Sequence, residues 1–326
     1  MEIVSLFIQT LLFRPYVFLF LAVSLFVAHR LLGWKRTAWF FGVTWITAFA
    51  CEFSSTRTGV PFGWYHYTGS TLGQELYLSN IPFMDSLSFT FLLFASYCLA
   101  LFLLLPSRHS TLAPGVPTGS LLGRLYLGFT RDTRTSWPVL VLSVLLFVFI
   151  DMIVDPVALR GDRWFLGRIY SYPAPGIHFG VPIANYVGWG VVGLISLASY
   201  FFLDRRLPDV SRDDTVPVTG DLLLGCALYY SVLIFILAVS FWIGEPVIGA
   251  TGLFTYIPIT ALVVLRILGG DPVVGRLPGT RNVIVPFANR QSDITARPHA
   301  SSRMGDAGTR ARSHTDAPDK PRVSDS

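Results

Sequence analysis

Charged side chains are scarce in this sequence. Asp, Glu, Lys and Arg make up 14% of its 326 residues, whereas hydrophobic residues make up 52%. Together with a mean hydropathy of +0.55, this excludes a chain that folds around one water-soluble core. The formal net charge of +5 comes largely from the ends of apolar runs and from the polar carboxyl-terminal segment, so it indicates topology and not nucleic-acid binding. We therefore predict an integral membrane protein.

Residue patterns that mark several classes of enzyme are also missing. The three cysteines have no paired spacing, which argues against a disulfide framework or a zinc site. No two of the six histidines lie within one or two helical turns, so the histidine boxes of membrane di-iron enzymes are excluded. The GxSxG, HExxH and CxxC motifs are absent as well. We predict neither a metal nor a cofactor.

Seven apolar runs approach the length of about 20 residues that crosses a bilayer. The second run is short and is closed by Glu52, and the preceding Ile3–Phe13 is separated from the first run by Pro15, which predicts an interfacial helix. We predict an all-α, polytopic membrane bundle of about seven transmembrane helices. The predicted spans are Tyr16–Leu32, Ala38–Phe53, Phe83–Leu105, Trp137–Val154, Val181–Leu203, Leu222–Ile243 and Val247–Leu268.

The basic residues of the loops predict an orientation in the membrane, and the composition of the tail predicts disorder. Lys and Arg are more frequent in one set of alternate loops (Arg30, Lys35, Arg36, Arg108, Arg124, Arg131, Arg134, Arg205, Arg206, Arg212) than in the other (Arg14, Arg57, Arg160, Arg163, Arg168). By the positive-inside rule, the amino terminus faces outward from the inner (cell) membrane and the carboxyl terminus is cytoplasmic. Residues 1–275 form the membrane domain, residues 276–326 a disordered basic cytoplasmic tail, and residues 106–136 a flexible connection.

Acidic residues gather at the predicted outer face. Glu52 ends the second span, Asp85 opens the third, and Asp151 and Asp155 end the fourth. Ionisable groups at this depth normally face a protein interior or a wet cavity, which makes these four candidates for function. Asp151 and Asp155 are four residues apart and share one helix face. For Asp155, which precedes a proline, a turn-forming role is the alternative.

The acids at the other face have a different interpretation. Asp204, Asp209, Asp213 and Asp214 lie in a polar loop on the predicted cytoplasmic side. We predict that they are ordinary solvated charges.

Two loops rich in glycine, proline and aromatic residues flank the outer acids. Residues 59–69 read GVPFGWYHYTG and residues 176–189 read GIHFGVPIANYVGW. Their aromatic side chains combine flat apolar surfaces with polar tips and are candidates to line a site, although an interfacial aromatic belt would explain part of them. The candidates are Trp64, Tyr65, Tyr67, Tyr186 and Trp189. Two histidines, His66 and His178, also lie in these loops and are expected to form hydrogen bonds there.

The residues leave several functions open. The spacing of Asp151 and Asp155 matches the DxxxD motif with which intramembrane prenyltransferases hold magnesium on a diphosphate. Such enzymes need two acidic clusters in one cavity, and the second match, Asp209 to Asp213, is predicted on the opposite side. A small-molecule transporter or a noncatalytic pigment-assembly protein is also compatible with several spans and buried acids.

A longer set of motifs carries a resemblance to a known family. Glu52 is followed by GVPFG at 59–63 and by Tyr65 and Tyr67, and DPVA at 155–158 is followed by GVP at 180–182, NY at 185–186 and GW at 188–189. Over about residues 35–270, the chain resembles the carotenoid biosynthesis membrane proteins typified by CruF, the carotenoid 1,2-hydratases. This resemblance implies addition of water to the terminal C-1,2 double bond of an acyclic carotenoid, which gives a tertiary alcohol. It also implies an acyclic carotenoid and water as partners, beside the lipid bilayer that the composition predicts, and it leaves association with other carotenoid enzymes open.

Chemistry suggests roles for the candidate residues. Hydration begins with protonation of an alkene, which a carboxylic acid kept neutral in an apolar site can perform. We assign Asp155 or Asp151 as proton donor, Glu52 as the base that orients water, and Asp85 as support. Aromatic faces stabilise a cation, so the predicted wall around the end group is Trp64, Tyr65 and Trp189. Tyr67 is a further candidate for substrate binding, and Asn185 and Tyr186 are candidates to position water. Carotenoid cyclisation, which starts with the same protonation, is the alternative reaction.

Overall fold

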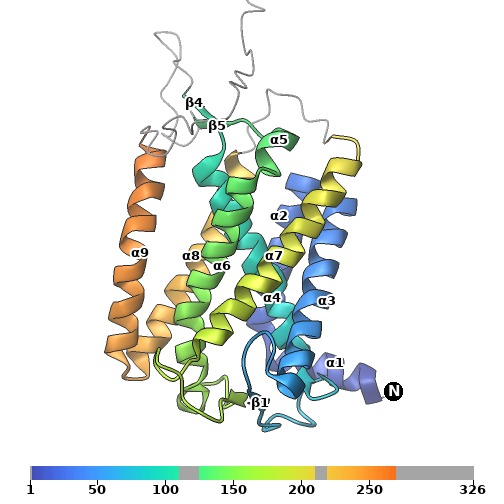
Figure 1. Cartoon of the computed structure of the whole chain (residues 1–326), viewed down its shortest axis with the longest axis vertical. Coiled ribbons are helices and arrows are strands. Elements are labelled where there is room, and N and C mark those ends of the chain that lie inside the picture. Colours follow the sequence, from blue (N-terminus) through green and yellow to red (C-terminus); the bar gives the residue numbers. More distant parts are fainter. Residues whose placement is uncertain (1, 110–124, 210–218, 269–326) are drawn as a thin grey trace, which may run out of the picture. The chain divides into compact units, whose positions relative to one another are not determined.

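The computed structural model describes residues 2–109, 125–209 and 219–268 (Figure 1). Helices dominate this part of the chain, which confirms the predicted all-α class. The helices are α1 (Glu2–Phe13), α2 (Pro15–Leu32), α3 (Trp34–Thr58), α4 (Phe83–Leu104), α5 (Arg131–Arg134), α6 (Trp137–Ala158), α7 (Ile183–Arg206), α8 (Thr219–Trp242) and α9 (Pro246–Ile267). The predicted tail, residues 276–326, lies outside the described residues, so its disorder stays a prediction.

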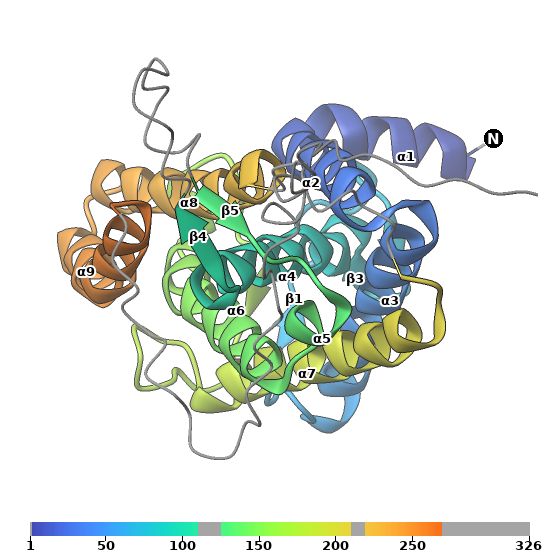
Figure 2. The ribbon, with the colours of Figure 1, turned by 90° about the horizontal axis from the view of Figure 1, so that it is seen from above.

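Six stretches of helix in the described part are long and apolar enough to cross a membrane, in agreement with a polytopic membrane protein. They are α2, α4, the stretch Arg131–Ala158 that contains α6, α7, α8 and α9. The predicted second span corresponds to α3, a helix of 25 residues that is less apolar than these six. It packs beside α4 and α7 within the same bundle (Figures 1 and 2).

Helix α4 occupies the centre of the bundle. It packs against α2, α3, α6 and α8, and Figure 2 shows it surrounded by these helices. Its sequence is apolar on every face, as expected for a helix that is buried all round. Asp85 lies in its first turn, so the position of α4 brings this acid to the middle of one end of the bundle.

Helix α6 extends further than the sequence predicts. The predicted span ends at Val154 because Pro156 follows, but the helix continues to Ala158 with Pro156 inside it. Proline lacks the N–H donor and its ring crowds the carbonyl one turn earlier, but its φ is helical, and Leu159 N still donates to Asp155 O at 2.9 Å. As a result, Asp151 and Asp155 lie on one continuous helix.

The end of the bundle that carries the four acids also holds short strands and α1 (Figure 1). Strand β1 (His66–Tyr67) pairs antiparallel with β6 (Tyr170–Ser171), and β2 (Tyr77–Leu78) pairs with β3 (Ile81–Pro82). Helix α1 lies crosswise to the bundle at this end (Figures 1 and 2). It is separate from α2 and too short to cross a bilayer, as the break at Pro15 predicts.

The connection between α4 and α6 is more regular than predicted. In the described parts of 106–136, β4 (Ser107–His109) pairs with β5 (Leu125–Leu127), and α5 follows. A capping box formed by Thr130 and Thr133 fixes the start of α5. These local bonds explain why a segment rich in proline and glycine still contains regular structure near its ends.

Candidate active site

One pair of acids is bridged by a tyrosine. Glu52 lies near the carboxyl end of α3 and Asp85 in the first turn of α4. The Tyr67 hydroxyl is 2.9 Å from Glu52 Oε1 and 2.7 Å from Asp85 Oδ2. Ser86 Oγ donates to the other oxygen of Glu52. The Tyr67 hydroxyl has one proton to donate, and it contacts both carboxyl groups. Glu52 and Asp85 are therefore joined into one hydrogen-bonded unit through this shared hydroxyl.

The second pair of acids is bridged by an amide. Asn185 Nδ2 donates to Asp151 Oδ2 at 2.8 Å and to Asp155 Oδ2 at 2.9 Å. Asp155 also accepts from Tyr172 at 2.9 Å and, through its other oxygen, from Tyr170. Both carboxyl groups face α7, as their spacing of one helical turn predicts. The structure therefore joins α6, α7 and the loop that carries β6 at one polar centre.

The loops are held over the acids by pairing and by close packing. In the β1–β6 register, Tyr67 lies opposite Tyr170, which brings the donors of the two acid pairs to neighbouring positions. A Cβ atom at Gly188 on α7 would lie 2.1 Å from the Phe62 ring. Only glycine at this position lets the first loop pack directly on α7.

Burial controls the protonation of the tyrosines. Desolvation, followed by the neighbouring carboxyl groups, raises the pKa of the Tyr67 phenol well above its ordinary value. The same two causes raise the pKa of Tyr170. Both hydroxyls therefore keep their protons at any physiological pH and act as hydrogen-bond donors to the acids.

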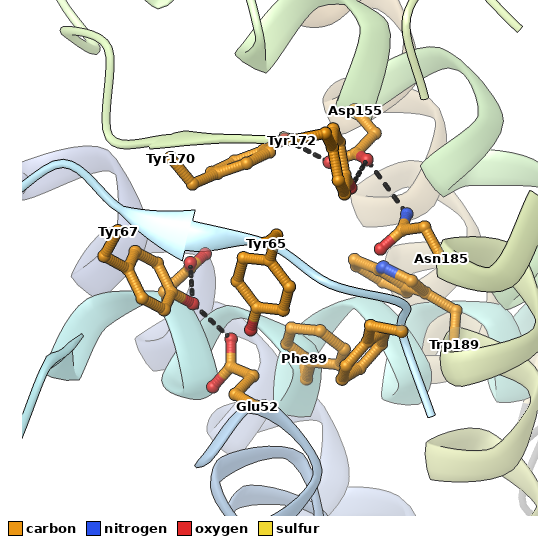
Figure 3. Close-up of a pocket in the computed structure, with 11 residues that line it drawn as sticks. Glu52, Tyr65, Tyr67, Phe89, Asp155, Tyr170, Tyr172, Asn185 and Trp189 are labelled. Atoms are coloured by element: carbon orange, nitrogen blue, oxygen red, sulfur yellow. Dashed lines mark hydrogen bonds between the residues drawn. The ribbon is translucent and has the colours of Figure 1, made fainter. Parts of the chain in front are cut away.

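One polar pocket of about 340 Å³, including its open part, lies at this end of the bundle (Figure 3). It is enclosed by residues from the 59–69 loop, from the segment that carries β6, and from four helices. In Figure 3, Glu52 and Tyr67 lie on one side, and Asp155, Tyr172 and Asn185 on the other. One wall is aromatic, because the Trp189 ring stacks on Phe89 with centroids 4.1 Å apart. The lining residues are Glu52, Phe62, Tyr65, Tyr67, Asp85, Phe89, Asp155, Tyr170, Tyr172, Asn185 and Trp189.

Most of the predicted site residues meet at this pocket. Asp151 contacts Asn185 but lines a neighbouring cavity instead. Trp64 is 58% exposed and Tyr186 pairs with His178 Nδ1 at 2.5 Å, so neither lines the pocket. Burial lowers the pKa of His178, which favours the neutral form of its imidazole. The other loop histidine, His66, pairs separately with Ser171 at 2.9 Å.

The sequence interpretation missed several residues of the pocket. Tyr170 and Tyr172 hydrogen-bond to Asp155, and Phe62 and Phe89 supply apolar wall. Two tyrosines two residues apart, as in both Tyr65–Tyr67 and Tyr170–Tyr172, share one face of an extended segment. This repeated pattern could have predicted Tyr170 and Tyr172 as pocket residues. The two phenylalanines lie in apolar sequence, where no local pattern distinguishes them from other apolar residues.

The prediction that Asp204 is a solvated charge is wrong. Its side chain is 0% exposed and accepts from Arg134 Nε at 2.7 Å and from Arg36. Arg134 also binds Asp209 at 2.9 Å, whose side chain is 53% exposed. Helix α7 continues to Arg206 and carries Asp204 into the bundle. The two remaining acids of this group, Asp213 and Asp214, lie outside the described residues.

Comparison with known proteins gives a family. A sequence model described as "Carotenoid biosynthesis protein" matches residues 13–258. Bisanhydrobacterioruberin hydratase from Haloarcula japonica is 29% identical over 169 residues, which are 50% of this chain and 46% of that protein. The chain thus spans less than half the length of this relative. No solved structure matches the chain. The match over most of the sequence, together with the loop motifs that form the pocket, shows that the chain belongs to the carotenoid biosynthesis protein family.

Proposed function

We propose that this protein is a carotenoid hydratase that adds water to the terminal C-1,2 double bond of an acyclic carotenoid end group. Membership of the carotenoid biosynthesis family and the likeness to a protein named as a carotenoid hydratase support this reaction class. The observation that carries the proposal is the polar pocket itself. It combines the carboxyl pair of Glu52 and Asp85, the carboxyl group of Asp155, which Asn185 joins to Asp151, and an aromatic wall at one end of a membrane bundle.

The reaction needs an acid, a stabilised cation and a bound water. A neutral carboxyl group gives its proton to C-2, and the π electrons of the double bond form the new C–H bond. The resulting tertiary cation at C-1 lies against aromatic faces such as Trp189, whose quadrupole attracts positive charge. The oxygen of water then bonds to C-1, and a carboxylate takes the proton that the water loses. One water is consumed and the total number of protons on the enzyme is unchanged.

The residues of the pocket and the neighbouring Asp151 divide these roles. Asp155 or Asp151 gives the proton, and Glu52, supported by Asp85, accepts a hydrogen bond from the attacking water. Tyr67 and Asn185 fix the orientation of the carboxyl groups. Tyr65 and Trp189 form walls around the end group.

The test is expression in a host that accumulates lycopene or another acyclic carotenoid. Extracts analysed by chromatography and mass spectrometry are expected to contain a more polar pigment that is heavier by one water for each hydrated end. A product isomer of unchanged mass would show that the protein catalyses cyclisation and not hydration. The absence of any new pigment, despite verified expression in the membrane with several acyclic carotenoids, would reject the proposal.

A further inference from the structure

A second, larger cavity adjoins the polar pocket. It contains about 830 Å³ of empty space, including its open part, and lies among α2, α4, α6 and α8. Apolar side chains such as Phe91, Val232 and Ile236 form most of its lining. Half-buried aromatic residues, including Tyr16, Trp164 and Phe235, line the rest of it together with the acids. A cavity of this size and composition fits an apolar ligand with few polar groups.

The two cavities meet at the acids. Asp85, Asp155, Tyr170 and Trp189 line both of them. The other two acids are divided, because Glu52 lines only the polar pocket and Asp151 only the apolar cavity. The four carboxyl groups therefore form a series from a polar to an apolar environment.

Asp151 differs from Glu52 and Asp155 in its hydrogen bonding. Its Oδ2 accepts from Asn185, but its Oδ1 is buried and has no hydrogen-bond partner among the described residues. By contrast, both oxygens of Glu52 and both oxygens of Asp155 accept hydrogen bonds. A buried carboxyl oxygen without a partner is costly unless a ligand or a proton satisfies it.

We propose that the apolar cavity holds the linear isoprenoid chain next to the reacting end group, and that Asp151 is the group that protonates the alkene. This inference rests on the proposed hydratase function. The end group lies where the cavities meet, with Asp151 on its apolar side. Water approaches from the polar pocket on the side of Glu52 and Asp155.

The proton balance follows from this placement. Asp151 gives a proton to C-2, water adds at C-1, and the proton lost by water passes to a carboxylate of the polar pocket. Asp155 is placed to return this proton to Asp151, since it lies one helical turn from Asp151 and shares the amide of Asn185 with it. Return of the proton from Asp155 to Asp151 restores the starting state.

The first experiment tests the cavity with a matched pair of substitutions on α8. Ile236 is 4% exposed and lines the cavity, whereas Ile234 is 64% exposed on the outside of the same helix. Ile236→Trp fills the cavity and is expected to lower hydration roughly tenfold or more, whereas Ile234→Trp keeps the wild-type rate. The smaller change Val232→Phe replaces Ile236→Trp if the latter does not give a monodisperse protein in detergent.

The second experiment separates proton donation from water capture. In D₂O, a reversible protonation at C-2 places deuterium in carotenoid that is recovered without hydration. Glu52→Gln is expected to lower hydration but to keep this exchange, whereas Asp151→Asn loses both, each by about 100-fold or more. Because a variant that fails to fold would also lose both, Asp151→Asn must match Glu52→Gln in monodispersity and unfolding temperature in detergent for its loss of exchange to support proton donation.

The outcomes distinguish this inference from the proposed function. If the wild-type protein hydrates carotenoid but Asp151→Asn keeps exchange, the donor assignment is overturned. If Ile236→Trp and Val232→Phe both fold and hydrate at the wild-type rate, the cavity holds something else, such as a lipid acyl chain. If the wild-type protein does not hydrate any acyclic carotenoid, it is the proposed function that fails.

Discussion

At the scale of single residues, Tyr67 connects the two elements that carry Glu52 and Asp85. Its hydroxyl contacts both carboxyl groups, and its half-buried ring packs beside Tyr65 and Tyr170. Because the phenol stays protonated, it supplies a fixed donor to this pair. The sequence predicted this residue as a candidate for substrate binding, but its position between two acids makes it a polar positioning residue.

We predict that Tyr67→Phe lowers hydration at least roughly tenfold, because the water-orienting acid loses the donor that fixes it. Removal of a hydrogen bond to buried carboxyl groups should also cost about 1–3 kcal/mol of folding free energy. Product formation in membranes and thermal unfolding in detergent measure the two effects. Tyr77→Phe, which removes only the contact with Thr71, is the control. Equal activities of the two variants would contradict this role.

Asp204 gives a second prediction at this scale. Asp204→Asn leaves the buried guanidinium of Arg134 and its neighbour Arg36 without their shared carboxylate. Loss of one partner of a buried pair typically costs about 3–5 kcal/mol. The matched change Asp209→Asn, at an exposed carboxylate of the same network, should cost about 1 kcal/mol or less. Equal unfolding temperatures of both variants would show that Asp204 is not a buried structural charge.

At the scale of elements, the helices were predictable because apolar length alone indicates a membrane-spanning helix. Their ends were less predictable, because α6 passes through Pro156 and α7 continues to Arg206. These extensions have consequences at both ends of the bundle. The first places Asp155 inside a helix, and the second buries Asp204.

The contact between the loop after α6 and the start of α9 gives a prediction on pH. Arg160 and Arg163 bind Glu245 at 2.8 and 2.6 Å. The hydrogen bond from Arg160 is the main cause that lowers the pKa of Glu245 below its ordinary value of 4.5. A lowered folded-state pKa contributes stability that is present above the unfolded value and is lost as the pH falls through the folded value.

We therefore expect Glu245→Gln to lower the unfolding temperature at neutral pH, by an amount that corresponds to about 1 kcal/mol or less. The difference from the wild type should shrink as the pH falls below 4.5. Thermal unfolding in detergent over a pH series measures this. Asp162→Asn, in the same exposed loop, is the control for a change of charge alone. A difference that stays constant over the series would refute the ion-pair explanation.

At the scale of the whole molecule, the distribution of Lys and Arg predicts that the acid-bearing end faces outward. The described residues provide exposed positions at both ends for a test. A cysteine at Asp162, near the acids, should react with a membrane-impermeant maleimide in intact cells. A cysteine at Arg206, at the other end of α7, should react only after the membrane is opened. The background would carry serine at the native cysteines, and the reverse labelling pattern would invert the proposed topology.

The sequence by itself determined the class of this protein and singled out most residues that line the polar pocket. Apolar length indicates membrane helices whatever their neighbours, and the cost of burying charge marks Glu52, Asp85, Asp151 and Asp155 as exceptional. The local motifs of the two loops also indicated the protein family.

Only the tertiary structure decided which of these groups touch. Contacts between helices depend on packing that no local pattern encodes, so the bridges through Tyr67 and Asn185 could not be derived from spacing. For the same reason Trp64 lies outside the pocket, whereas Tyr170 and Tyr172 lie within it. The division of the acids between a polar and an apolar cavity likewise follows from how α4, α6 and α7 pack around them.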